Sequence, residues 1–184
     1  MMRLFFALRP PSPARDLLLD LQDGVADARW QDDEQLHVTL RFVGEVERPV
    51  AEDLADALEG FRGPAPLASL AGVGAFGGRG RAGALWAGLT PREPLLALHR
   101  KLDQLCVRAG LAPERRAFAP HVTIARLPRG VPTGGPEVER WRARHASFRS
   151  EPFAFDRVIL YRSRLGRAGA SYEALLEAAL FPAA

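Results

Sequence analysis

One four-residue pattern occurs twice in the chain and constrains its fold more than any other feature. The first copy is His37-Val38-Thr39-Leu40, and the second is His121-Val122-Thr123-Ile124, 84 positions later. Both lie in apolar runs rich in β-branched residues, which favour strands. Successive side chains of a strand point to opposite faces. We therefore expect each copy to present its histidine and threonine on one face and to anchor its two apolar residues on the other.

Two histidines and two threonines in one cleft suit acid-base chemistry at a phosphate. The unperturbed pKa of histidine lies near neutrality, so one imidazole can be neutral while the other is protonated. A neutral histidine can take a proton from water, and a protonated one can give a proton to a leaving oxygen. Threonine hydroxyls can donate hydrogen bonds to the non-bridging oxygens. Displacement at phosphorus runs in line, and two similar halves of a protein would place the imidazoles on opposite sides of one phosphate.

Metal ligation is the main chemical alternative, because two histidines can bind Zn²⁺. No third histidine, cysteine or carboxylate lies at ligand spacing from His37 or from His121. We therefore expect catalysis without a metal or any other cofactor.

A second motif, the GxGxxG pattern at residues 72–77, does not predict a dinucleotide site. That pattern requires a helix directly after the glycines, whereas residues 77–83 are mostly glycine and arginine. We expect a flexible hairpin tip there, with Arg79 and Arg81 placed to contact a substrate backbone.

Composition indicates an ordinary globular protein with a basic second half. The chain has 184 residues, of which 47% are hydrophobic and 26% charged. Residues 1–99 carry 10 arginines and 14 acidic residues, while residues 100–184 carry 15 basic and 8 acidic residues. A basic surface attracts polyanions. No apolar run is long enough to span a membrane, the short apolar N-terminus fits a strand and not a signal peptide, and a lone Cys106 suits a reducing cytoplasm.

Periodicity and turn residues predict an α+β protein with the order β-α-β-α-β-β-α-β-α-β-β. We expect strands at 2–8, 36–43, 67–76, 84–89, 121–127, 153–162 and 171–180, and helices at 13–29, 49–61, 94–109 and 138–144. Each half contributes a strand, a helix and a strand that carries one tetrapeptide. We therefore expect one bilobal domain over 1–184, with two pseudo-symmetric lobes, facing and mostly antiparallel sheets, helices outside and a cleft between the lobes.

Four stretches of the chain, at residues 3–8, 36–44, 118–126 and 160–165, resemble the bacterial RNA 2′,3′-cyclic phosphodiesterases. These proteins are also called 2′-5′ RNA ligases and belong to the two-histidine phosphoesterase superfamily. The resemblance covers almost the whole chain, and both tetrapeptides match without departure. It implies metal-independent opening of a terminal 2′,3′-cyclic phosphate to a 2′-phosphate, with 2′-5′ RNA ligation as the related transfer.

The resemblance also implies roles for individual residues. His37 would protonate the departing O3′, and His121 would activate water. Thr39 and Thr123 would hold the phosphate. Arg126, five positions after His121, would contact the phosphate or the base. Phe42, five positions after His37, would lie against the nucleobase. The expected partner is RNA with a cyclic phosphate end, tRNA fragments included, and we expect a monomer without membrane contact.

Two other functions, and non-catalytic roles for several of these residues, are also compatible with the sequence. A superfamily relative acting on another small cyclic phosphate would use the same four residues, and a non-enzymatic RNA-binding module would need only the basic charge. Phe42 also fits a core position. Strict alternation places Arg41 on the His37 face, where it could line the cleft rim. His99 and His145 have no partner motif, and we expect no catalytic role for them.

Overall fold

The computed structural model describes residues 1–77, 82–166 and 169–182, and the expected hairpin-tip residues Arg79 and Arg81 lie outside these ranges. The helices are α1 (Ser12–Leu19), α2 (Arg48–Glu59), α3 (Glu93–Arg108) and α4 (Pro136–Arg144), with a 3₁₀ turn η1 (Asp33–Gln35). The strands are β1 (Met2–Leu8), β2 (Arg29–Trp30), β3 (Val38–Val46), β4 (Leu67–Phe76), β5 (Gly83–Thr90), β6 (His121–Leu127), β7 (Phe153–Ala154), β8 (Arg157–Gly166) and β9 (Gly169–Ala179).

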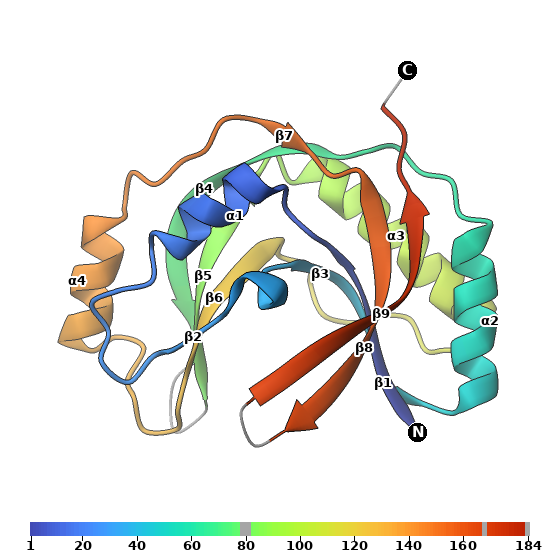
Figure 1. The fold of residues 1–184 in the computed structure, drawn as a ribbon, viewed down its shortest axis with the longest axis horizontal. Coiled ribbons are helices and arrows are strands. Elements are labelled where there is room, and N and C mark those ends of the chain that lie inside the picture. The colour runs from blue at the N-terminus through green and yellow to red at the C-terminus, as the bar shows by residue number, and fades with distance from the viewer. Residues whose placement is uncertain (78–81, 167–168, 183–184) are drawn as a thin grey trace.

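The strands form one antiparallel sheet in the order β7-β4-β5-β6-β3-β1-β8-β9, with β2 paired to β6. Its two halves meet where Val38 of β3 pairs with Val122 of β6, so the valines of the two tetrapeptides are direct partners. Figure 1 shows β4, β5 and β6 diverging from the β8–β9 hairpin on either side of this junction. The α+β antiparallel prediction is confirmed, and the two expected sheets are halves of one curved sheet.

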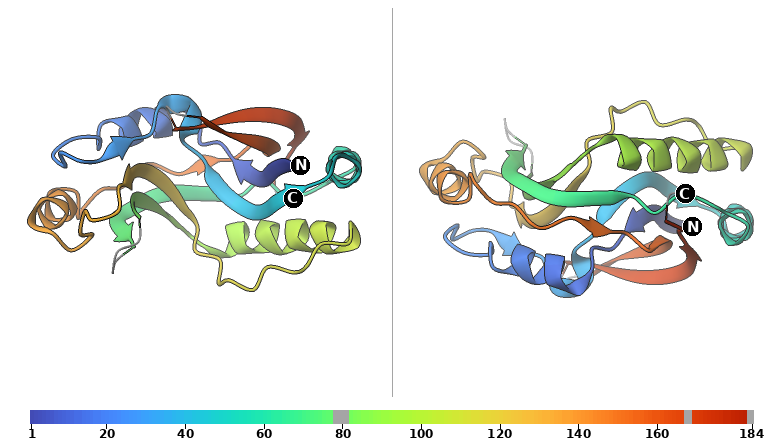
Figure 2. Two further views of the ribbon diagram at one scale, coloured as in Figure 1. Left: turned by 90° about the horizontal axis from the view of Figure 1, so that it is seen from below. Right: turned by 90° about the horizontal axis from the view of Figure 1, so that it is seen from above.

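The helices lie outside the sheet (Figure 2), as expected. Helix α3 packs along β3, α2 contacts β9 and α4 contacts β4. One apolar cluster runs through the molecule between these layers, and it includes Leu4, Phe6 and Leu8 of β1 together with Leu95, Leu98 and Leu102 of α3. A second, small cluster on the opposite face of β1 consists of Phe5, Ala7, Ile159 and Tyr161.

Some predicted boundaries are wrong. The helix expected over 13–29 ends at Leu19, because a turn and Gly24, with a φ of 77°, follow it. Its apolar period continues into irregular chain, where Leu21 stays buried and its carbonyl accepts a 2.8 Å hydrogen bond from the indole of Trp141. The strand expected to end at residue 43, before Gly44, runs on to Val46, since β3 passes through Gly44 with a φ of 90°. The strand expected over 153–162 is divided into β7 and β8.

Both tetrapeptide strands contain a β-bulge at the fourth tetrapeptide position. In β3, Phe6 pairs with Arg41 while Ala7 pairs with Thr39, which leaves Leu40 as the extra residue. In β6, Leu85 pairs with Ala125 while Trp86 pairs with Thr123, which leaves Ile124 as the extra residue. An extra residue reverses the alternation of the side chains that follow it, up to the next irregularity, which in β3 is a second extra residue at Val43.

The bulges decide which side chains face the cleft. Arg41 and Ala125 are turned into the core, and Phe42 and Arg126 are turned to the opposite face. The predicted placement of Arg41 on the His37 face is therefore wrong, and Arg41 does not line the cleft. The carbonyl of the bulged Leu40 accepts a 2.6 Å hydrogen bond from Nδ1 of His99, so this interrupted part of the ladder is satisfied from α3.

Arg41 instead joins β3 to α3 and to the chain that follows it. Its Nε donates to Asp103 at 2.7 Å, and its two Nη groups donate to the carbonyls of Phe42 and Ala112. Asp103 also accepts a 2.9 Å bond from the backbone of Glu114. The Arg41 side chain is only 7% exposed, so these partners stand in place of water.

We expect the Arg41→Ala substitution to lower the free energy of unfolding by about 3–5 kcal/mol, because it removes the cation that pairs with the Asp103 carboxylate and the donor of two carbonyls. Urea denaturation of the purified protein measures this change. The matched control is Arg48→Ala, which removes an exposed pair with Glu52 one helical turn away and is expected to have little effect. An equal loss of stability in both variants would contradict the structural role of Arg41.

Candidate active site

The two motif histidines are held in the same way. Nδ1 of His37 lies 2.7 Å from the carbonyl of Gln35, and Nδ1 of His121 lies 2.7 Å from the carbonyl of Ala119. A carbonyl can only accept a hydrogen bond, so Nδ1 carries the proton in both rings. Nε2 is then the atom that can accept or release a proton toward a ligand. In His37 this atom lies 3.2 Å from the hydroxyl of Thr39.

The structure brings five of the six predicted site residues around one cavity of about 280 Å³. We call it the histidine cavity, and its lining includes His37, Thr39, His121, Thr123 and Arg126. A larger cleft of about 470 Å³ adjoins it, because His37, Thr39 and Arg126 line both spaces. We call this the arginine cleft, and the sixth predicted residue, Phe42, lies in its wall with 43% of its surface exposed.

The charge of these two spaces is positive. Arg3 and Arg29 join Arg126 in the arginine cleft, and no aspartate or glutamate lines either space within the described part of the chain. The guanidinium carbon of Arg3 lies 5.0 Å from the centre of the Phe42 ring, in the arrangement of a cation-π contact. Arginine offers a planar fork of donors that suits phosphate. The site is therefore built for an anion that also carries a flat group.

Both imidazoles have lowered pKa values. Burial lowers the pKa of His37 to about 4, and the nearby charges of Arg126 and His121 act in the same direction, against the bond to Gln35. Burial and Arg126 also lower the pKa of His121. Both rings are thus neutral at pH 7 in the free protein. A bound anion between them would favour their protonated forms and raise both pKa values.

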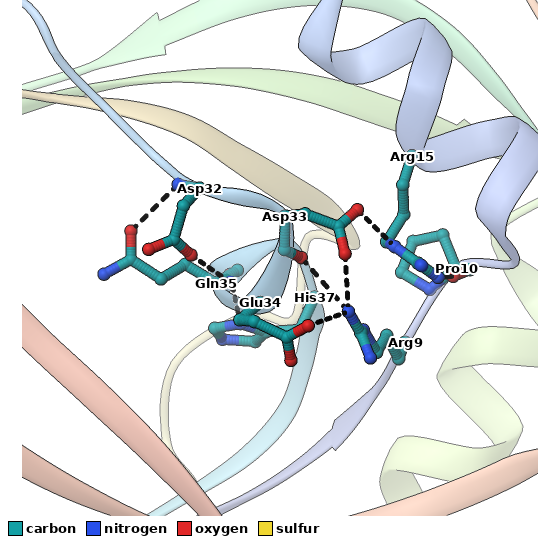
Figure 3. Close-up of polar contacts among 8 residues, drawn as sticks. All are labelled: Arg9, Pro10, Arg15, Asp32, Asp33, Glu34, Gln35 and His37. Carbon is teal, nitrogen blue, oxygen red and sulfur yellow. Dashed lines mark hydrogen bonds and ion pairs between the residues drawn. The ribbon is translucent and has the colours of Figure 1, made fainter.

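An aromatic and hydrogen-bonded support fixes His37. The ring of Phe5 lies 5.0 Å from it, and Tyr172 meets it edge-on at 5.0 Å. Asp32 and Gln35 close a reciprocal capping box around η1, at 3.0 and 3.1 Å. The Gln35 amide also donates to the carbonyl of Ala170 in β9 at 2.7 Å. Figure 3 shows this box beside the Asp33 carboxylate, which is bound by Arg9 and Arg15.

Sequence reasoning missed Tyr172, Gln35, Trp30 and Arg3 as parts of the site. The spacing of Asp32 and Gln35 is a capping-box signal that could have drawn attention to the residue before the first tetrapeptide. Nothing in the local sequence distinguishes Tyr172 or Arg3, since long-range strand pairing places them. His99 and His145 line neither space. His99 stacks on Phe118, and His145 meets Trp141 edge-on.

In the described part of the chain there is no group of three or more histidine, cysteine or acidic side chains that could hold a metal ion. No helix there has the length and apolar character needed to cross a membrane.

The fold and paired histidines correspond to a known family. A family model described as the 2′-5′ RNA ligase superfamily matches residues 10–167, and the chain belongs to this superfamily. Among curated relatives, the RNA 2′,3′-cyclic phosphodiesterase of Geobacillus stearothermophilus is 34% identical over 140 residues, which are 74% of this chain and 43% of the relative. That of Thermotoga maritima is 27% identical over 186 residues, or 96% of this chain and 94% of the relative. This chain thus spans less than half the length of the Geobacillus protein.

Solved structures agree with this placement. E. coli LigT complexed with 3′-AMP has a TM-score of 0.74 and 27% identity, covering 97% of this chain and 98% of LigT. The TT0787 protein of Thermus thermophilus has a TM-score of 0.76 at 23% identity, covering 98% and 99% of the two chains, and supports the fold alone. The family resemblance stated from the sequence is confirmed.

The burial of both imidazoles and the nearby Arg126 charge predict how the two histidines titrate. In the free protein we expect the pKa of His37 near 4 and that of His121 below 6.5, with Nδ1 protonated in both neutral rings. Side-chain NMR of the imidazole nitrogens measures both properties. Inorganic phosphate should raise the two pKa values, and it should do so less in Arg126→Ala. A pKa of His37 at or above 6.5 in the free protein would contradict the burial argument.

Proposed function

We propose that this protein is an RNA 2′,3′-cyclic phosphodiesterase that works without a metal ion. The observation that carries the proposal is the pair of imidazoles in one positively charged cavity, each with Nδ1 bound to the main chain and Nε2 left for chemistry. The names of the Geobacillus and Thermotoga relatives support the same activity. The arginine cleft has the volume of a small-ligand pocket, and its arginines and Phe42 suit a nucleotide.

In the proposed reaction a water molecule attacks phosphorus opposite O3′. His121 takes the proton of this water at Nε2, the bond from phosphorus to O3′ breaks, and His37 gives its proton to O3′. The product is a 2′-phosphate with a free 3′-hydroxyl. Thr39, Thr123 and Arg126 bind the non-bridging oxygens and stabilise the charge that develops on them. Phe42, in contact with Arg3, carries the nucleobase.

The low pKa of His37 is compatible with its role as acid because the substrate supplies the missing charge. His37 is neutral in the free protein at pH 7. The cyclic phosphate is an anion, and its binding favours the imidazolium form. Protonation of His37 is thereby coupled to substrate binding. The roles of acid and base remain part of the proposal.

We further propose 2′-5′ RNA ligation as a second activity, and RNA ends such as those of tRNA fragments as substrates. The basic second half of the chain supports an RNA partner. We also propose that the protein acts as a monomer. A location in the reducing cytoplasm is supported by its sole cysteine, Cys106, which is buried and has no possible disulfide partner within the chain.

We expect His37→Ala and His121→Ala each to reduce hydrolysis of an RNA 2′,3′-cyclic phosphate by at least about a hundredfold, because each removes one proton-transfer step. Chromatography of the product should show phosphate on the 2′ oxygen. The matched control is His145→Ala, which removes an imidazole that lies beside Trp141 and lines neither the histidine cavity nor the arginine cleft. Wild-type activity should persist in the presence of a chelator. Full hydrolytic activity of either motif variant would overturn the two-histidine mechanism, whereas no hydrolysis by the wild type would point to a non-enzymatic role.

A substrate with an activated leaving group separates the acid from the base. In a nitrophenyl phosphodiester the nitrophenolate departs without a proton. Loss of the acid then has little effect on the rate, while loss of the base slows the reaction as much as it does with RNA. We expect His37→Ala to recover at least about tenfold of its lost activity on this substrate, and His121→Ala to recover almost none. Recovery by His121→Ala alone would reverse the assignment.

A further inference from the structure

A third cavity, of about 360 Å³, lies on the far side of His121 from the arginine cleft. We call it the aromatic cavity, and its lining includes Phe76, Trp86, Pro120, His121 and Arg92. It shares His121 and Phe76 with the histidine cavity, whereas His37 does not line it. The three spaces therefore follow one another, with His37 between the first two and His121 between the last two.

Two glycines, Gly88 and Gly72, shape the sheet beside this cavity. Gly88 pairs with His121 across the β5–β6 ladder, and a Cβ on Gly88 would lie 2.7 Å from the carbonyl oxygen of Ala71. The β4 ladder is interrupted between Leu70 and Val73, where Gly72 has a φ of 72°. Gly88 thus permits the close approach of the β4 backbone, and Gly72 permits the break in regular pairing beside the cavity; a Cβ on Gly72 would meet nothing within 4 Å.

The walls of the aromatic cavity suit a nucleoside. The rings of Phe76 and Trp86 lie 5.0 Å apart at 30°, and Phe76 meets the His121 ring edge-on at 4.9 Å. Phe76 is 42% exposed, although it is a large apolar side chain. Exposed aromatic rings are platforms on which nucleobases stack. Within the described part of the chain, this lining has two residues that can carry a charge, His121 and Arg92. The permanent positive charge of Arg92 suits a phosphate.

We propose that the aromatic cavity binds the nucleoside whose 5′-hydroxyl is the nucleophile in ligation. This inference rests on the proposed function and on its assignment of His121 as the base. In-line displacement requires the nucleophile to enter opposite O3′, on the side of His121. When water is the nucleophile the cavity is not needed. When an RNA 5′ end is the nucleophile, its first nucleoside must lie beside His121, with Phe76 against the base and Arg92 near the following phosphate.

The chemical step is balanced without a further reactant. The 5′-hydroxyl gives its proton to Nε2 of His121, and its oxygen forms a bond to phosphorus. The bond from phosphorus to O3′ breaks, and O3′ receives a proton from His37. The products are a 2′-5′ phosphodiester and a free 3′-hydroxyl. Cleavage of such a diester back to the cyclic phosphate follows the same path in reverse and uses the same cavity.

A partition experiment tests this assignment. A donor RNA with a 2′,3′-cyclic phosphate is incubated with an acceptor RNA that has a 5′-hydroxyl, and ligated and hydrolysed products are measured together. Both reactions use His37 and His121, so any disturbance of the histidines largely cancels in their ratio. We expect Phe76→Leu and Arg92→Glu to lower the ratio of ligation to hydrolysis about tenfold at a fixed acceptor concentration.

The matched control is Arg108→Glu, which makes the same charge change in the groove between α2 and α3. It should leave the ratio within about twofold of the wild type. The proposal is overturned if both cavity variants keep the wild-type ratio, if Arg108→Glu lowers the ratio as much as Arg92→Glu, or if the wild type hydrolyses the donor but forms no ligated product at any acceptor concentration. Failure of the wild type to hydrolyse the donor would instead refute the proposed function.

Discussion

The pairing of Val38 with Val122 is the contact on which the site depends. It joins the two halves of the sheet and lies between a histidine and a threonine on each strand. Because the second residue of one tetrapeptide pairs with the second residue of the other, both valines point to the core and both histidines and threonines face the same cavity. A slip of one residue in either strand would turn one histidine into the core. The apolar positions of the tetrapeptides thus fix where the polar positions act.

The paired bulges extend this arrangement beyond the tetrapeptides. Without them, the residue four positions after each histidine would face the cleft and the residue five positions after it would face the core. Leu40 and Ile124 reverse this order, so that Phe42 and Arg126 come to the ligand side while Arg41 and Ala125 pack inward. One half thereby contributes an aromatic ring and the other a guanidinium. The two similar strands thus carry two chemically different side chains, which suits the base and the phosphate of the substrate proposed above.

Much of this can be predicted from the sequence, and the failures have definite causes. The α+β class, most strands and the meeting of the two motifs follow from hydrophobic periodicity and from a repeated pattern. Strict alternation puts Arg41 on the wrong face because it cannot foresee a bulge, which depends on the partner strand. The predicted first helix runs past Leu19 because Leu21 and Val25 keep a helical spacing while they are buried in irregular chain. Tyr172 and Arg3 reach the site only through the pairing of β9 with β8 and of β1 with its neighbours.

The attachment of each Nδ1 to a main-chain carbonyl has a consequence for which residues positions 37 and 121 can tolerate. The side chain must donate a hydrogen bond from one atom, as Nδ1 does, and must offer a second atom that can gain or lose a proton, as Nε2 does. Both atoms must be held in one rigid, planar group. Asparagine and glutamine can donate to the carbonyl but do not titrate, and carboxylates titrate but have no donor when ionised. At Thr39 and Thr123, by contrast, serine would keep the hydroxyl. Variation among functional homologues should therefore be permitted at the two threonines and absent at the two imidazoles.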